Sequence, residues 1–294
     1  MRLSVSKLIV LFSLSAFAFV GAQPRGLGVA PAFARAFSSP DAAFAAQNPD
    51  IMLPAQSEAK ARELINSAIQ ALGGDAYLRV RDISRTGRLS QFGSNGALMG
   101  FVEVFDYTKL PDKRRREYSK RRNIIDVFNG DEGWSLDREG IEETSAFSLD
   151  AFQENLRRGM DNFFRFRFNK EDGIILRYGG SDLVDMKQVD WVEVSDREHR
   201  VIRIAIDRNT HLPIRAVNFQ RDPDTRNPAQ EVDYFSNYQP IQGVTTPFRV
   251  ARDRAGRRVS ETVYTSIQYN SGLDDSLFSR ASLEQRWSQI GKKK

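Results

Sequence analysis

Apolar side chains recur at three- and four-residue steps near the start of the chain, at Ala61, Leu64, Ile65, Ala68, Ile69 and Leu72. This spacing places them on one side of a helix. Ser57 suits the N-cap of such a helix, and Gly73-Gly74 suits its end, because glycine accepts the left-handed conformation after the last turn. The pattern therefore predicts a helix over residues 57–72.

Period-two alternation dominates most of the remaining chain and predicts strands separated by turn signals such as Asn95-Gly96 and Asp222-Pro223-Asp224. The predicted strand segments are 79–92, 98–107, 113–128, 134–136, 189–194, 202–206, 212–221, 230–239, 244–253 and 258–269. Parallel strands would need long crossovers, so these short connections predict an antiparallel meander.

A second helical pattern interrupts the strands. Over residues 147–164, apolar side chains recur at helical spacing, at Leu149, Phe152, Leu156, Met160 and Phe163. The run Phe164-Arg165-Phe166-Arg167-Phe168 then alternates, which predicts a return to extended chain. The predicted fold class is therefore α+β, with a large antiparallel sheet, an N-terminal helix and a central amphipathic helix.

The N-terminus has the pattern of a secretory signal peptide. Arg2 and Lys7 precede or border an apolar run, Leu8 to Val20, and Val20-Gly21-Ala22 supplies small residues for cleavage. The alternative is a membrane anchor, but this run is short of the roughly 20 residues that a bilayer core requires. We expect cleavage near Ala22 and a periplasmic mature protein.

Composition divides the rest of the chain. Residues 23–54 are rich in Ala, Pro, Gly and Ser and predict a disordered linker. Residues 55–282 carry the folded pattern, and residues 283–294 predict a basic C-terminal tail ending in Lys292-Lys293-Lys294. The chain has no cysteine, so a core and not disulfides must stabilise it.

The formal net charge is +5, with basic runs at Lys113-Arg114-Arg115-Arg116 and Lys120-Arg121-Arg122. Acidic and basic residues are otherwise interspersed, and no base-stacking or groove-reading element accompanies the runs. We read them as solvated strand faces and expect no nucleic-acid partner.

Candidate chemistry is sparse. His199 and His211 fall in predicted turns and do not make up a zinc ligand set, so we expect no metal and no cofactor. The consecutive acidic pairs Glu142-Glu143, Glu171-Asp172 and Asp274-Asp275 are poor acid–base candidates, because neighbours on a strand point to opposite faces. No nucleophile elbow or phosphate loop is present, so we predict no catalytic residues and no enzyme.

The chain contains 20 phenylalanines, and its sheet has a face that the central helix would cover. The helix either seals that face completely or leaves room for an apolar guest. The sequence by itself leaves both alternatives open.

The order of five short motifs resembles the LolA-like superfamily, the periplasmic carriers that sort outer-membrane lipoproteins. The motifs are Ala71-Leu72-Gly73-Gly74, Asn129-Gly130-Asp131-Glu132-Gly133-Trp134, Ile206 to Arg215, Tyr238 to Pro247, and Leu273-Asp274-Asp275-Ser276-Leu277-Phe278. Together they span about residues 57 to 280. The linker and the 147–168 insertion are longer than the short sorting carrier has.

The resemblance implies a half-open β barrel with helices over an apolar concave face that holds acyl chains of lipids or lipoproteins. The ligand-cavity residues that we predict are Trp134, Leu149, Phe152, Leu156, Met160 and Phe163. The implied function is an exported soluble carrier or sensor, in outer-membrane lipoprotein sorting or transport. The alternative is an envelope-stress regulatory module that binds a membrane protein partner.

Overall fold

The computed structural model describes residues 52–221 and 227–291. The predicted signal peptide, residues 1–22, lies outside the described residues, as do the predicted linker up to residue 51 and the lysines at 292–294. Among the residues that are described, no helix is long and apolar enough to cross a membrane.

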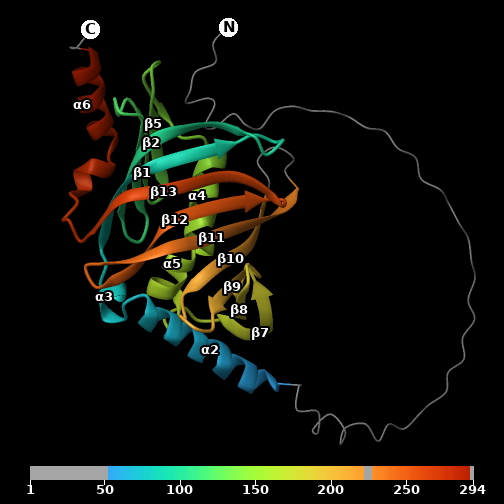
Figure 1. The fold of residues 1–294 in the computed structure, drawn as a ribbon. Helices are drawn as coiled ribbons and strands as arrows, with labels where there is room; N and C mark the ends of the chain where they lie inside the picture. The colour runs from blue at the N-terminus through green and yellow to red at the C-terminus, as the bar shows by residue number, and fades with distance from the viewer. Residues whose placement is uncertain (1–51, 222–226, 292–294) are drawn as a thin grey trace, which may run out of the picture.

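One antiparallel sheet of thirteen strands forms the body of the protein (Figure 1). Its strands are hydrogen-bonded in the order β6-β5-β4-β3-β2-β1-β13-β12-β11-β10-β9-β8-β7, so among the described residues β6 and β7 are the two edge strands and the sheet does not close. The curved half-barrel, with its N-terminal and central helices, confirms the predicted α+β fold.

Two meanders make up the sheet. The first contains β1 (Asp82–Phe92), β2 (Leu98–Lys109), β3 (Lys113–Tyr118), β4 (Ile124–Asn129), β5 (Glu132–Leu136) and β6 (Ile141–Glu143). The second contains β7 (Ile175–Val184), β8 (Lys187–Ser195), β9 (Val201–Asp207), β10 (Pro213–Arg221), β11 (Pro228–Ile241), β12 (Val244–Arg254) and β13 (Arg257–Tyr269). Pairing of β1 with β13 joins the two meanders into one sheet, with Ile83 opposite Tyr269.

Helix α2 (Pro54–Ala71) confirms the predicted N-terminal helix and begins three residues earlier than expected. Proline suits the first turn, where its missing N–H has no intrahelical partner to lose. The hydroxyl of Ser57 therefore does not cap the helix. It accepts the backbone N–H of Tyr178 on β7 at 2.9 Å.

Helix α2 ends at the predicted glycines and meets the β11–β12 turn there. Gly73 has a φ of +123°, and a Cβ at this position would collide with the carbonyl oxygen of Gly243. The backbone N–H of Thr245 also donates to the carbonyl oxygen of Leu72 at 2.9 Å. Glycine thus permits the close approach that fixes the end of α2 and the start of α3 (Asp75–Leu78).

The largest apolar core lies between α2, residues 160–168 and one face of the sheet. The predicted stripe of α2 is buried in it, and strand residues such as Ile204 and Phe248 complete it. Burial of large side chains of this kind stabilises the fold by about 1.5–3 kcal/mol each.

The central segment consists of α4 (Ala146–Arg158), the single turn α5 (Met160–Asn162) and the π-helix η2 (Phe163–Arg167). The prediction of extended chain over residues 164–168 is wrong. A wide helical turn allows Phe163, Phe164 and Phe168 all to enter the main core. The alternating arginine, Arg165, is buried too, with its guanidinium 3.6 Å from the centre of the Tyr77 ring.

Helix α6 (Arg280–Gly291), which follows the 3₁₀-helix η3 (Asp275–Phe278), occupies most of the stretch predicted as a basic tail. Phe278 and Leu283 are fully buried against Ile125 and Val127 of β4. Ordered structure therefore continues past the boundary that we expected at residue 282.

Candidate functional site

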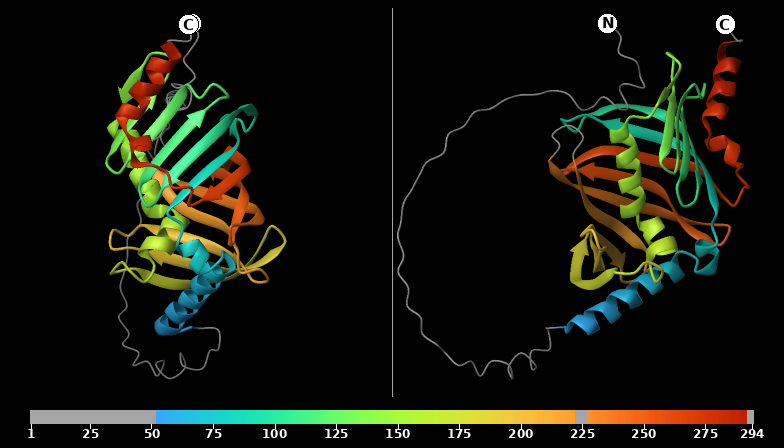
Figure 2. Two further views of the ribbon diagram at one scale, coloured as in Figure 1. Left: turned by 90° about the vertical axis from the view of Figure 1, so that its left-hand side faces the viewer. Right: turned by 180° about the vertical axis from the view of Figure 1, so that it is seen from behind.

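Helix α4 crosses one face of the curved sheet (Figure 2). Of the thirteen residues in α4, Phe152 alone is buried. Helix α2 by comparison buries five residues. The apolar side of α4 is therefore only partly covered by the sheet, and a few specific contacts hold the helix in place.

The middle of α4 contacts three strands. The ring of Phe152 stacks on that of Phe128 in β4, with centroids 4.3 Å apart and planes inclined by 14°. The side-chain oxygen of Asn155 accepts hydrogen bonds from Gln220 Nε2 of β10 at 3.2 Å and from Arg252 Nη1 of β12 at 3.5 Å. These contacts span the curved face from one meander to the other.

A charged cluster anchors the central segment to the β8–β9 turn. The carboxylate of buried Asp196 accepts from Arg167 Nη2 at 2.9 Å and from Arg200 Nη1 at 3.2 Å, and Arg200 Nε donates to Glu154 of α4 at 3.2 Å. Burial by itself would raise the pKa of Asp196. The backbone N–H of Arg200 and the two guanidinium groups outweigh burial and hold that pKa below its usual value.

The predicted cavity residues divide among three places. Leu149, Phe152 and Leu156 share the apolar side of α4, where Leu149 and Leu156 are half-buried. Met160 and Phe163 lie instead in the main core with α2. The first half of the predicted stripe is thus only partly buried, and the second half is core.

Trp134 lies on the other face of the sheet. It pairs across the strands with Val127, whose neighbour Phe128 points to α4, so strand alternation directs Val127 and Trp134 away from α4. Trp134 packs in the cluster that contains Phe278 and Leu283. The structure therefore does not bring Trp134 together with the other predicted cavity residues.

A row of charged side chains lies on the same face as α4. Arg114 pairs across the strands with Phe128, and Arg116 pairs with Asp106, which places all four on one side. Asp106 is fully buried, and its Oδ2 lies 2.6 Å from Arg114 Nη2 and 3.0 Å from Arg116 Nε. Two arginines thus compensate one buried carboxylate.

Arg85 extends this row without a carboxylate of its own. It sits opposite Asp106, donates from Nη2 to Thr108 Oγ1 at 3.2 Å and lies 5.4 Å from the centre of the Tyr264 ring. Its Nε is buried without a hydrogen-bond partner, and Arg85 forms no ion pair among the described residues. With Asp126 opposite Arg116, this row contains three arginines and two carboxylates.

A second charged group lies on β11 and β12. Arg252 forms a bidentate pair with Asp233, with distances of 2.6 Å and 2.8 Å, and Arg254 Nε lies 2.8 Å from the buried carboxylate of Glu231. In each pair, the positive charge of the arginine balances the negative charge of its carboxylate. Because Arg252 also reaches Asn155, they connect the sheet to α4.

The two groups influence one another electrostatically. Burial would lower the pKa of Arg116 and of Arg252, but the carboxylates of Asp106 and Asp233 raise each above its usual value. The charge of Arg116 opposes that of Arg252, so the two guanidinium groups are close enough to repel. Asp126 differs, because burial raises its pKa in spite of nearby Arg116.

The only sequence signal for these charged groups was the basic run at residues 113–116, which we interpreted as a solvated face. All four of its side chains are partly or fully buried, and Arg115 pairs with buried Glu117 at 2.7 Å on the opposite side of β3. Their carboxylate partners come from other strands or from the same strand two residues away, and spacing along the chain does not identify such pairs.

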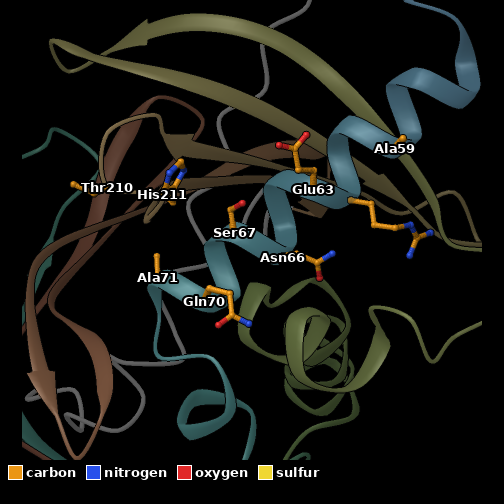
Figure 3. Close-up of a pocket in the computed structure, with 9 residues that line it drawn as sticks. Ala59, Glu63, Asn66, Ser67, Gln70, Ala71, Thr210 and His211 are labelled. Atoms are coloured by element: carbon orange, nitrogen blue, oxygen red, sulfur yellow. The ribbon is translucent and has the colours of Figure 1, made fainter.

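A separate groove of about 840 Å³ runs along the outward side of α2 (Figure 3). It is lined by Ala59, Arg62, Glu63, Asn66, Ser67, Gln70, Ala71, Thr210 and His211. The positions from α2 lie opposite its buried stripe. His211 is in the predicted turn, and no set of three metal-ligating side chains occurs within residues 52–221 and 227–291. The groove is not the predicted acyl cavity.

No protein-family model matches the chain, and no curated protein matches it in sequence. Solved structures do match. A DUF1329 family protein from Desulfovibrio piger aligns with a TM-score of 0.54 at 15% identity, covering 76% of this chain and 98% of that chain.

Two further solved structures have names that connect them to the superfamily whose motifs this sequence resembles. A LolA superfamily protein from Nitrosomonas europaea has a TM-score of 0.50 at 13% identity, over 76% of this chain and 99% of that one. A putative outer membrane lipoprotein-sorting protein domain from Vibrio parahaemolyticus has a TM-score of 0.52 at 11% identity, over 77% and 99%. The chain therefore has the fold of the LolA superfamily.

Proposed function

We propose that this chain, which has the LolA-superfamily fold, is an exported carrier that binds an acyl chain between α4 and the sheet. The acyl chain belongs to a lipid or a lipoprotein, and the carrier works in outer-membrane lipoprotein sorting or transport in the periplasm. The fold shared with a LolA superfamily protein and a lipoprotein-sorting domain supports this proposal.

The partial burial of α4 is the observation that carries the proposal. Leu149 and Leu156 stand on the same side of the helix as Phe152, yet only Phe152 is buried. A helix that sealed the face as plain core would bury all three, as α2 buries its stripe. Half-covered apolar side chains facing a sheet are the surface that an acyl chain can cover.

Arg85 supplies the polar end of the proposed site. It lies on the face below α4 and forms no ion pair with a carboxylate among the described residues. A carboxylate or phosphate head group next to Arg85 would offset the positive charge of its guanidinium. We therefore place the head group toward β1 and the chain along the apolar side of α4.

The energetics suit a carrier that must also release its cargo. Transfer of about 12 methylenes out of water contributes near 10 kcal/mol at most, at about 0.8 kcal/mol each. Association costs about 4 kcal/mol or more. The remaining 6 kcal/mol or less corresponds to dissociation constants of tens of micromolar or weaker.

Mass spectrometry of lipids that co-purify with the protein from native envelope tests the proposal. We expect lipids or acylated peptides at a stoichiometry that Leu156→Asp reduces. Recovery of a stable protein partner with no lipid would instead favour the alternative, a regulatory module that binds an envelope membrane protein.

A further inference from the structure

The tip of the β1–β2 hairpin exposes an unusual group of apolar side chains. Leu98, Met99 and Phe101 are 58%, 48% and 66% exposed, all at the start of β2. Exposed apolar residues that occur singly need no explanation, but three on one hairpin form a patch in contact with water. Figure 1 shows this hairpin projecting from the sheet beside the β12–β13 turn.

Two arginines without carboxylate partners flank these side chains. The guanidinium of Arg88 lies 5.0 Å from the centre of the Phe101 ring, and Arg257 Nη1 donates to the carbonyl oxygen of Ser94 at 2.7 Å. Neither arginine forms an ion pair with any carboxylate in the described ranges. Both are exposed, so their charges face solvent at the same place as the apolar patch.

The tip of the hairpin carries no acidic residue, and the first carboxylate along β2 is Glu103, which lies opposite Arg88. Between residues 88 and 101 the single charged side chain is Arg88. The nearest carboxylate on β13, Glu261, is already engaged by Arg249 at 2.8 Å and Arg258 at 3.2 Å. The tip therefore combines apolar side chains with two exposed arginines that form no ion pair among the described residues.

We infer that this tip surface, composed of Leu98, Met99, Phe101, Arg88 and Arg257, docks onto an anionic lipid membrane. Apolar side chains with arginine at their edge match the interface of a bilayer, where the apolar groups enter the acyl boundary and the guanidinium groups meet lipid phosphates. A neutral or acidic partner surface would satisfy only one of these two features. The inference does not depend on acyl-chain binding under α4.

Vesicle co-sedimentation of the purified protein tests this inference. We expect binding to vesicles of equimolar phosphatidylcholine and phosphatidylglycerol that is much stronger than binding to pure phosphatidylcholine and that weakens with added salt. Leu98→Ser with Phe101→Ser should weaken binding at least about tenfold. Arg88→Gln with Arg257→Gln should weaken it by about fivefold per arginine, on mixed vesicles only.

The β7–β8 hairpin offers a matched control. Leu183 and Met186 are 63% and 90% exposed at another turn, so Leu183→Ser with Met186→Ser removes equivalent apolar surface. This variant should bind as the wild type does, and thermal melting should show every variant folded.

Three results would overturn the inference. These are wild-type protein that does not sediment with mixed vesicles, a tip variant that binds as tightly as wild type, and equal binding to pure phosphatidylcholine. If the wild type forms a dimer that the tip variant loses, and the wild type does not bind vesicles, the occupant of this surface is a second copy of the chain. That result would likewise contradict a membrane.

Discussion

Phe128 of β4 and Phe152 of α4 stack almost parallel, with ring centroids 4.3 Å apart, and this pair joins the buried side chain of α4 to the sheet. Around it, α4 is held by polar groups such as Asn155 and Glu154. Helix α4 thus differs from α2, whose attachment is an apolar core.

This difference predicts that Phe152→Ala releases α4 while leaving the main core folded. The substitution removes a buried aromatic side chain, which costs about 3 kcal/mol or more in a core. Because α4 has few other contacts, the cost should appear as local opening. Hydrogen exchange of residues 146–158 should accelerate, whereas exchange in α2 should stay slow. Uniform acceleration in both helices would contradict a separately attached α4.

Leu156→Asp tests the proposed binding space directly. A charge on the apolar side of α4 would face the acyl chain without a partner, so binding of a fluorescent fatty acid should weaken at least about tenfold. Leu183→Asp on β7 is the matched control, because Leu183 is exposed and is a leucine of no proposed role. If both variants lose binding equally, or if neither loses it, the result would count against an acyl-binding site between α4 and the sheet.

The lowered pKa of Asp196 predicts that acid weakens the charged cluster that joins α4 and Arg167 to the β8–β9 turn. Its folded-state pKa is lowered, so the stability that it contributes is fully present above the unfolded value of about 3.9 and is lost as pH falls through the folded pKa. Asp196→Asn should lower the free energy of unfolding at pH 7 by about 1–3 kcal/mol, because charge-assisted hydrogen bonds are lost. Its melting temperature should then depend less on pH below about 4 than that of the wild type.

Asp126 serves as a control, because its pKa is shifted in the opposite direction to that of Asp196. Burial raises its pKa in the folded state, so its ionisation opposes folding as pH rises from the unfolded pKa through the folded one. Asp126→Asn should therefore melt near pH 7 at the same temperature as the wild type or higher. A fall in melting temperature as large as that of Asp196→Asn would show that the two carboxylates do not differ as described.

Export predicts a processed N-terminus. The positive start, the apolar run and the small residues before Gln23 place the cleavage point after Ala22. N-terminal sequencing of envelope-fraction protein should begin at Gln23. Protein that retains Met1 in that fraction would argue for a membrane anchor.

The sequence predicted the helices and strands where one physical rule dominates. The stripe from Ala61 to Ile69 is buried on one side, so helical spacing located α2 correctly. The alternating pattern over residues 164–168 led to a wrong prediction of extended chain. A period-two pattern over five residues also fits a wide helical turn, in which Phe164 and Phe168 share one core. Helix α6 was missed because its buried side is narrow, with Leu283 as its fully buried side chain.

The candidate site was predictable only in part. Helical periodicity placed Leu149, Phe152 and Leu156 on one side of a helix, as they are in α4, but it could not show that Met160 and Phe163 enter the main core after Gly159. The charged row on the same face depends on strand register, which pairs Asp106 with Arg116. Register follows from the packing of the whole sheet, and no local pattern specifies it.

Titration of delipidated wild-type protein with a fluorescent long-chain fatty acid tests the central claim most directly. If an acyl chain binds between α4 and the sheet, fluorescence should saturate with a dissociation constant of tens of micromolar and one site per chain. An unlabelled fatty acid should compete for that site. Folded protein that shows no saturable binding in this concentration range would contradict the proposed carrier.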